Sequence, residues 1–236
     1  MNAVAVFRQL FEASSSAYTY LLADRSGGQA VLIDPVQGQE QLYLSLLQEE
    51  GLALRLLLET HLHADHVTGG AALREATGAR IGIAALAGTP CADLQLAGGD
   101  VLVFGDETLR VLATPGHTPG CLSFLWRDRL FSGDALLIGG CGRTDLPGGD
   151  AGQLYDSILR EIWPLPDETL VYPAHDFLHR RVSCVIQERE TNVRLAGRSR
   201  DEFIAMMAEA GLAPPRRARH NLLFNRQCGG AIAHAA

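Results

Sequence analysis

Short apolar runs predict strands in the first half of the chain, with helical spacing between some of them. The predicted strands are Val4–Phe11, Tyr18–Ala23, Ala30–Ile33, Leu54–Leu58 and Arg80–Ala84. Leu42, Leu46 and Leu47 recur at helical spacing and predict a helix over Gln39–Glu50, and a short Ala-rich helix is expected at Gly70–Thr77. Three strands therefore precede the first helix, and the later strands of this half are separated by helices.

The second half continues the same pattern. The predicted strands are Val101–Phe104, Thr108–Ala113, Cys121–Trp126, Leu130–Ser132 and Leu170–Tyr172, and the predicted helices are Gln153–Ile162, Cys184–Asn192 and Asp201–Ala210. Strands in hairpin groups separated by helices predict two packed sheets with helices outside. No break in composition marks a second domain, so we expect one domain over 1–229, and 230–236 as a loose Ala-rich tail.

Composition and charge narrow the class of protein. The formal charge of −7 argues against nucleic-acid binding, because no basic excess is present to neutralise phosphates. All twenty basic residues are Arg, which excludes Schiff-base chemistry and a phosphate-loop Lys. No apolar run reaches the roughly 18 residues of a membrane span, and the N-terminal residues do not resemble a signal peptide. We therefore expect a cytoplasmic protein that is not bound to a membrane.

Five cysteines lie far apart and form no CxxC pair. They are Cys91, Cys121, Cys141, Cys184 and Cys228. Their odd number and wide spacing predict neither a disulfide framework nor a Cys-rich zinc site.

Histidines and carboxylates gather directly after predicted strands. One segment reads His61-x-His63-x-Asp65-His66, and His117, Asp134 and His175 follow later strands. A lone loop His is usually a surface or hydrogen-bonded residue. Three His and an Asp within six residues are costly to desolvate together unless a metal or hydrogen bonds satisfy them. Imidazole and carboxylate are ligands of zinc and iron, so the pattern predicts a metal site.

The order of these motifs resembles the metallo-β-lactamase superfamily. The similar segments are Thr60–His66, Pro115–Gly120, Gly133-Asp134 and Pro173–His175. The resemblance implies an α/β fold, the αββα sandwich of two mixed β-sheets flanked by helices. It also implies a metal site at one edge of the sheets. The superfamily contains hydrolases and oxygenases, so the fold alone does not settle the reaction.

Finer features resemble the persulfide dioxygenases of that superfamily. They are Asp134–Ile138, Gly140–Asp145, Leu170–Asp176, Glu190–Leu195 and Cys228-Gly229. Glyoxalase II, a zinc thioester hydrolase acting on hydroxyacylglutathione, shares the Gly-Cys-Gly-Arg element but typically carries a longer C-terminal helical domain. It remains the alternative function.

The dioxygenase resemblance implies an iron enzyme. One Fe(II) per chain would be held by His61, His117 and Asp134, a facial triad that leaves positions for substrate and O2. Glutathione persulfide would be oxidised to sulfite with release of glutathione. No rhodanese-like segment is recognisable, so we expect any sulfurtransferase partner to be a separate chain. The sequence leaves open whether the chain forms a homodimer.

Four further residues match the second metal site of the binuclear hydrolases. They are His63, Asp65, His66 and His175. In the dioxygenases the corresponding residues are interpreted as hydrogen-bonded supports of the iron ligands. Two zinc ions per chain are therefore the alternative to one iron.

Arg143 is the leading substrate-binding candidate, because a guanidinium pairs bidentately with a glutathione carboxylate. The alternative is that Arg143 braces its loop through backbone carbonyls. Cys141 and Asp176 are further candidates near the pocket, although a structural thiol explains Cys141 equally simply. Phe177 stands where the family commonly has Tyr, so the hydrogen bonding near the site is expected to differ.

Overall fold

The computed structural model describes residues 5–213 and 215–231. These residues form two compact units, which are described separately. Unit 1 comprises the described residues of 1–96, 102–108 and 214–236, and unit 2 comprises 97–101 and 109–213. The prediction of a single domain over 1–229 stays a prediction, and most of the predicted tail, 232–236, lies outside the described residues.

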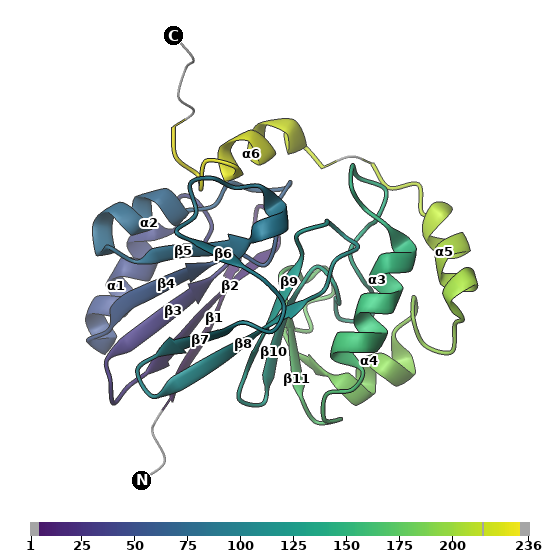
Figure 1. The fold of residues 1–236 in the computed structure, drawn as a ribbon, viewed down its shortest axis with the longest axis horizontal. Coiled ribbons are helices and arrows are strands. Elements are labelled where there is room, and N and C mark those ends of the chain that lie inside the picture. Colours follow the sequence, from purple (N-terminus) through teal and green to yellow (C-terminus); the bar gives the residue numbers. More distant parts are fainter. Residues whose placement is uncertain (1–4, 214, 232–236) are drawn as a thin grey trace. The chain divides into compact units, whose positions relative to one another are not determined.

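The first sheet has six strands in the order β1-β2-β3-β4-β5-β6 (Figure 1). Their bounds are β1 Ala5–Glu12, β2 Ala17–Asp24, β3 Gln29–Ile33, β4 Ala53–Leu58, β5 Arg80–Ala84 and β6 Leu94–Leu96. The pairs β1–β2 and β2–β3 are antiparallel, and β3 to β6 run parallel. The sheet is therefore mixed, and the ends of β3 and β4 lie at the same edge.

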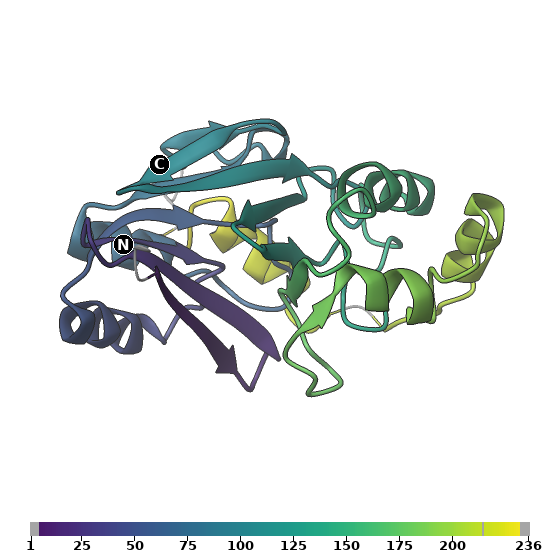
Figure 2. The same ribbon diagram turned by 90° about the horizontal axis from the view of Figure 1, so that it is seen from below.

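Two helices cover one face of this sheet (Figure 2). They are α1 (Glu40–Glu50) and α2 (Gly70–Thr77), and a 3₁₀ turn, η1 (Ala85–Ala87), follows β5. Tyr43 and Leu47 of α1 and Leu73 of α2 pack into one core with alternate residues of β1 to β5. The predicted helix is present, but Leu42, one of the three leucines that predicted it, is exposed, and Tyr43 packs in the core beside Leu47.

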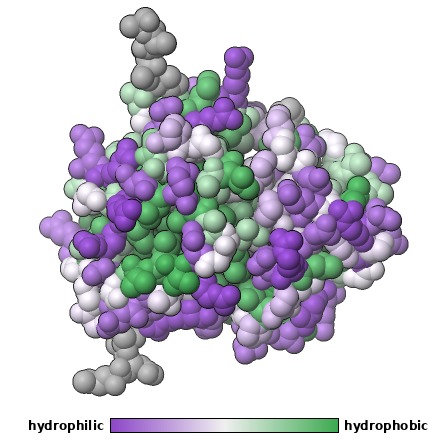
Figure 3. Space-filling model, viewed as in Figure 1, coloured by the Kyte–Doolittle hydropathy of each residue, from purple (hydrophilic) through white to green (hydrophobic). Residues whose placement is uncertain are grey.

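The second sheet has six strands in the order β12-β11-β10-β9-β8-β7. Their bounds are β7 Val101–Phe104, β8 Glu107–Ala113, β9 Leu122–Trp126, β10 Arg129–Gly133, β11 Leu170–Pro173 and β12 Ser183–Cys184. Strands β10 and β11 are parallel, and the neighbouring pairs β8–β9, β9–β10 and β11–β12 are antiparallel. On the face in Figure 3, hydrophobic surface gathers over the edge strand β7, where Val101 and Val103 are exposed.

The helices of unit 2 share a core with its strands. They are α3 (Ala151–Ser157), a π-helical segment η2 (Ile158–Ile162), α4 (Val185–Thr191) and α5 (Arg200–Ala208). Leu154, Ile158 and Phe203 pack in this core with Leu130 and Val171 of the sheet. The predicted helix 153–162 is thus present but changes to π-helical geometry in its second half.

The C-terminal part of unit 1 differs from the sequence prediction in two ways. A helix absent from that prediction, α6, spans Ala218–Asn225. Cys91 and Cys228 form a single disulfide across 137 residues of sequence, a pairing that the spacing of the cysteines did not predict. Cys121, Cys141 and Cys184 are not in disulfides. Among the described residues, none of the helices has the length and apolar character needed to cross a membrane.

Candidate metal centre

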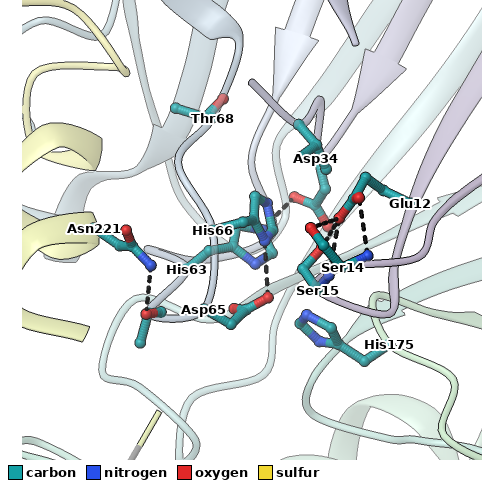
Figure 4. A network of polar contacts seen from close by, with 12 residues as sticks. Glu12, Ser14, Ser15, Asp34, His63, Asp65, His66, Thr68, His175 and Asn221 are labelled. Carbon is teal, nitrogen blue, oxygen red and sulfur yellow. Dashed lines mark hydrogen bonds and ion pairs between the residues drawn. The ribbon is translucent and has the colours of Figure 1, made fainter. Parts of the chain in front are cut away.

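The segment after β4 carries three of the predicted ligands of unit 1. His61, His63 and His66 are all buried, and their rings are in contact, with centroids 4.1 Å apart for His61 and His63 and 4.2 Å for His63 and His66. The Oδ2 atom of Asp65 lies 2.9 Å from Nδ1 of His66. Figure 4 shows His63 and His66 side by side, with Asp65 beside His66. The segment therefore brings all four predicted residues of unit 1 together.

A relay of hydrogen bonds fixes the ring of His61. The Thr60 hydroxyl donates to Oδ2 of Asp34 (2.8 Å), so it accepts at 3.0 Å from Nδ1–H of His61. The Thr60 backbone N–H donates to the other oxygen of Asp34 (2.7 Å). This arrangement places the imidazole proton on Nδ1 and the lone pair, which is what a metal binds, on Nε2.

Asp34 is a functional candidate that the sequence reasoning missed. It directly follows β3, whose parallel neighbour β4 leads into His61, and it adopts φ 51°, an unusual backbone angle for a non-glycine residue. The signal was present in the sequence as a carboxylate after the buried strand Ala30–Ile33.

Asp34 also pairs with His63 inside the unit. Its Oδ1 lies 3.1 Å from Nε2 of His63, and Oε2 of Glu59 lies 3.8 Å from the same atom. Burial lowers the pKa of His63, but the charge and hydrogen bond of Asp34 outweigh it and raise the pKa to about 9. Burial raises the pKa of Glu59 to about 8, and Asp34 acts in the same direction. Asp34 therefore favours the cationic form of His63, and burial favours the protonated form of Glu59.

Unit 2 brings together the other three predicted residues, His117, Asp134 and His175. Oδ2 of Asp134 lies 3.6 Å from Nε2 of His117, and Oδ1 lies 2.6 Å from Nδ1 of His175. Nδ1 of His117 lies 2.6 Å from the carbonyl oxygen of Arg143, to which it donates, so the lone pair of His117 is on Nε2. A carboxylate oxygen and an imidazole lone pair thus lie close together.

Gly142 makes this arrangement of unit 2 possible. A Cβ atom at this position would lie 2.4 Å from the carbonyl oxygen of Asp134 and 2.9 Å from Cγ of His117. The Gly142 N–H donates to the same Asp134 carbonyl at 2.7 Å. This close approach explains on steric grounds why the second glycine of the Gly140–Arg143 motif is required.

Arg143 uses its guanidinium within unit 2. Nε and Nη2 donate to the two oxygens of Asp145 at 2.6 and 2.7 Å. Nη1 donates to the carbonyl oxygen of Ala213 at 2.6 Å, and Nη2 donates also to that of Leu212 at 2.8 Å. These are the contacts of a loop-bracing residue, and the substrate-binding role of Arg143 stays a prediction.

The remaining candidates occupy three different environments. Cys141 is buried against Met207, and burial raises the pKa of its thiol to about 12. Asp176 is buried and accepts the backbone N–H groups of Leu178 and Arg181 at 2.9 Å each. Phe177 is 65% exposed, and its ring is parallel to that of His175 with centroids 6.0 Å apart. Their predicted roles at the substrate stay untested.

Comparison with known proteins places these motifs in a family. The model of the metallo-β-lactamase superfamily matches residues 15–175, a range that contains every predicted metal ligand. The chain belongs to this superfamily and has its fold, two mixed β-sheets flanked by helices. Membership of this superfamily, together with the His and Asp sets of the two units, supports a metal cofactor.

The similarity to one branch of the superfamily extends over almost the whole chain. The mitochondrial persulfide dioxygenase ETHE1 of Bos taurus is 44% identical over 231 residues, covering 97% of this chain and 90% of the relative. The crystal structure of ETHE1 from Myxococcus xanthus has a TM-score of 0.93 and 47% identity, covering 95% of this chain and all of that chain. A hydroxyacylglutathione hydrolase of Anaeromyxobacter dehalogenans is 37% identical, covering 84% of this chain and 75% of the relative. Within the superfamily, the chain belongs to the persulfide dioxygenase family.

Proposed function

We propose that this chain is an iron-dependent dioxygenase that oxidises glutathione persulfide. The proposal rests on the 44% identity to a persulfide dioxygenase over 97% of the chain. The balanced reaction consumes one glutathione persulfide, one O2 and one water, and yields glutathione, sulfite and two protons. Glutathione persulfide and O2 are therefore the proposed small-molecule substrates.

The donor set fits one Fe(II). His61 offers Nε2 because its Nδ1 proton is held by Thr60, and His117 offers Nε2 because its Nδ1 proton is held by the Arg143 carbonyl. Asp134 adds one carboxylate, so the set has two nitrogens and one oxygen, the donor types of a facial triad. Bound iron would provide one site for both the persulfide sulfur and O2, and it would also transfer electrons between them.

The chain's own residues prepare these donors. Asp34 acts through Thr60 to hold the His61 ring in one tautomer. His175 holds one oxygen of Asp134, which orients the carboxylate and supports its charge. His61 and His117 are 2% and 7% exposed, so water has little access to either ring. Preorganised ligands spare the protein a reorganisation cost when the metal binds.

His63 and the Asp65–His66 pair act as supports in this proposal. The ion pair of His63 with Asp34 links the second histidine of the segment to the carboxylate that positions the first. In the same segment, the Asp65 carboxylate pairs with the imidazole of His66. The alternative, a glyoxalase II-like hydrolase with two zinc ions, has weaker support because the hydrolase relative is less similar and covers less of the chain.

The deciding experiment measures the reaction and the metal on one sample. The chain is purified anaerobically, its iron and zinc are counted, and O2 consumption and sulfite formation are followed with glutathione persulfide. We expect about one iron per chain and sulfite produced in proportion to O2 consumed. Two zinc ions with full hydrolysis of an acylglutathione would refute the proposal.

A variant connects that activity to the ligand set. Asp134→Ala should lose both iron and activity, since two imidazoles leave the cation uncompensated. Wild-type iron content in this variant would remove Asp134 from the metal site. The cytoplasmic location, the homodimer and the separate sulfurtransferase stay predictions, and the bovine relative is named as mitochondrial.

A further inference from the structure

Two asparagines of α6 contact the backbone of the ligand segment in unit 1. Asn225 donates through Nδ2 to the carbonyl oxygens of His63 (2.8 Å) and His66 (2.9 Å). Asn221, four residues earlier on the same helix face, donates to the carbonyl of Ala64 at 2.9 Å. Figure 4 shows the Asn221 bond reaching the segment from the side opposite Asp34.

The surroundings of Asn225 fit an amide. Its Oδ1 accepts the backbone N–H of Thr68 at 2.9 Å, while its Nδ2 serves two carbonyls. Two acceptors and one donor around the side chain require an NH2 group and an oxygen in this orientation. An aspartate lacks the donor, and a glutamine is one methylene longer. Asn225 is 3% exposed, so water cannot readily replace these bonds.

The end of α6 is anchored to the same unit. The carbonyl of Cys228 accepts the N–H of Ala71 at 2.8 Å, and Cys228 forms the disulfide with Cys91. Gly229 approaches so closely that a Cβ atom there would lie 2.0 Å from the carbonyl oxygen of Thr68. The Cys228-Gly229 dipeptide therefore places Asn225 against the segment for covalent and steric reasons.

We propose that Asn225, assisted by Asn221, is a positioning residue for the metal centre. The segment 61–68 lies outside regular secondary structure, so its backbone groups need partners elsewhere. The two amides bond three carbonyls and one N–H within it, and so hold the backbone of His63 and His66, which begins two residues after His61. Neither asparagine is a metal ligand in this proposal. The inference rests on the proposed function, because it takes the segment to carry a metal ligand.

The expected effect is on metal binding by the folded protein. Removing an indirect support of metal ligands typically weakens affinity by 10- to 100-fold. We expect an effect of roughly that size for Asn225→Ala and Asn225→Asp, and a smaller one for Asn221→Ala, which loses a single bond. Asn225→Asp preserves the shape and removes the donor, so it separates hydrogen bonding from packing.

The experiment uses Co(II) as a probe of affinity and geometry. Each full-length variant is checked for folding by circular dichroism, and its Co(II) dissociation constant is measured by competition with a chelator. The Co(II) absorption spectrum reports ligand geometry, and hydrogen exchange of the Thr68 amide in the metal-free chain reports the bond to Asn225. We expect weaker Co(II) binding and an altered spectrum in both Asn225 variants. Exchange of the Thr68 amide should be faster in Asn225→Ala only, because Asn225→Asp keeps an oxygen that accepts this N–H.

A matched control separates positioning from stability. Phe224→Ala alters a partly buried residue of the same helix, whose ring packs at a tilt against His220 of that helix. It should lower the melting temperature and leave the Co(II) constant and spectrum unchanged. Wild-type affinity and spectrum in folded Asn225→Ala and Asn225→Asp would overturn the proposal. A wild-type chain that binds neither Co(II) nor iron would instead refute the proposed function.

Discussion

Oδ1 of Asp134 lies 2.6 Å from Nδ1 of His175, so one carboxylate oxygen of the predicted triad is already engaged by an imidazole of the same unit. The His175 proton must be on Nδ1 to make this bond, which puts its lone pair on Nε2. This contact is the one expected if His175 orients Asp134 in a site with a single metal ion. It also leaves His175 with the tautomer that a second-metal ligand would need. Metal counting on variants separates the two roles.

His175→Ala should weaken iron binding or activity by roughly 10- to 100-fold, because Asp134 loses the group that orients it. The number of metal ions per chain at saturation should stay at about one. Metal analysis with titration of Fe(II) under anaerobic conditions measures both quantities. His220→Ala, at an exposed histidine of α6, is the control and should behave like the wild type. A drop from two metals to one would show that the site is binuclear.

Arg143→Ala should destabilise the folded chain. The change removes the Asp145 pair and the bonds to the carbonyls of Leu212 and Ala213, and we expect a loss of about 1–3 kcal/mol in the free energy of unfolding. Arg143→Lys should recover only part of it, since a single ammonium cannot reproduce the fork. Denaturant unfolding with Arg160→Ala, a surface control, measures the effect.

The same Arg143 variants test the substrate-binding prediction. If the guanidinium grips glutathione away from the reacting sulfur, KM rises by about 10- to 150-fold with kcat nearly unchanged. Steady-state O2 consumption on iron-loaded protein gives both constants. A rise in KM at unchanged stability would favour gripping over bracing. A loss of stability with an unchanged KM in the folded fraction would favour bracing.

Local patterns predicted the ligand segments and the strands other than β6 and β12, because each depends on neighbouring residues. The apolar run Leu54–Leu58 formed β4, and the polar residues after it stand where a strand end places them. Helix α6 was missed because its buried side chains include Asn221 and Asn225, which hydropathy counts as surface residues. Two asparagines at helical spacing were the available signal, but their partners lie 157 or more residues away.

Long-range pairings could not be read from spacing. The bonds of Arg143 to Leu212 and Ala213 span about seventy residues, so the sequence left bracing and gripping both open. The pairing of Cys91 with Cys228 depends on where α6 meets the loop after η1, and that position depends on the fold as a whole.

The disulfide predicts the number of thiols in the oxidised protein. Unfolded in denaturant without reductant, the chain should titrate as three thiols per chain, from Cys121, Cys141 and Cys184, and as five after reduction. The closed loop is long, so Cys91→Ser should cost about 2–4 kcal/mol of stability. Thiol titration and denaturant unfolding of the oxidised wild type and Cys91→Ser measure these effects. Five thiols before reduction would contradict the disulfide.

Cys141 should be unreactive in the folded chain at neutral pH. Burial raises its pKa from 9.0 to about 12, so at pH 8 its thiolate is about a thousandfold scarcer than that of an unperturbed thiol. Because the folded-state pKa is the higher one, folding favours the neutral thiol, and its contribution to stability is lost as pH rises from 9 toward 12. Iodoacetamide labelling followed by mass spectrometry between pH 7 and 10 compares Cys141 with the half-buried Cys184. Labelling of Cys141 as fast as Cys184 would place its thiol in an open pocket and support a role at the substrate.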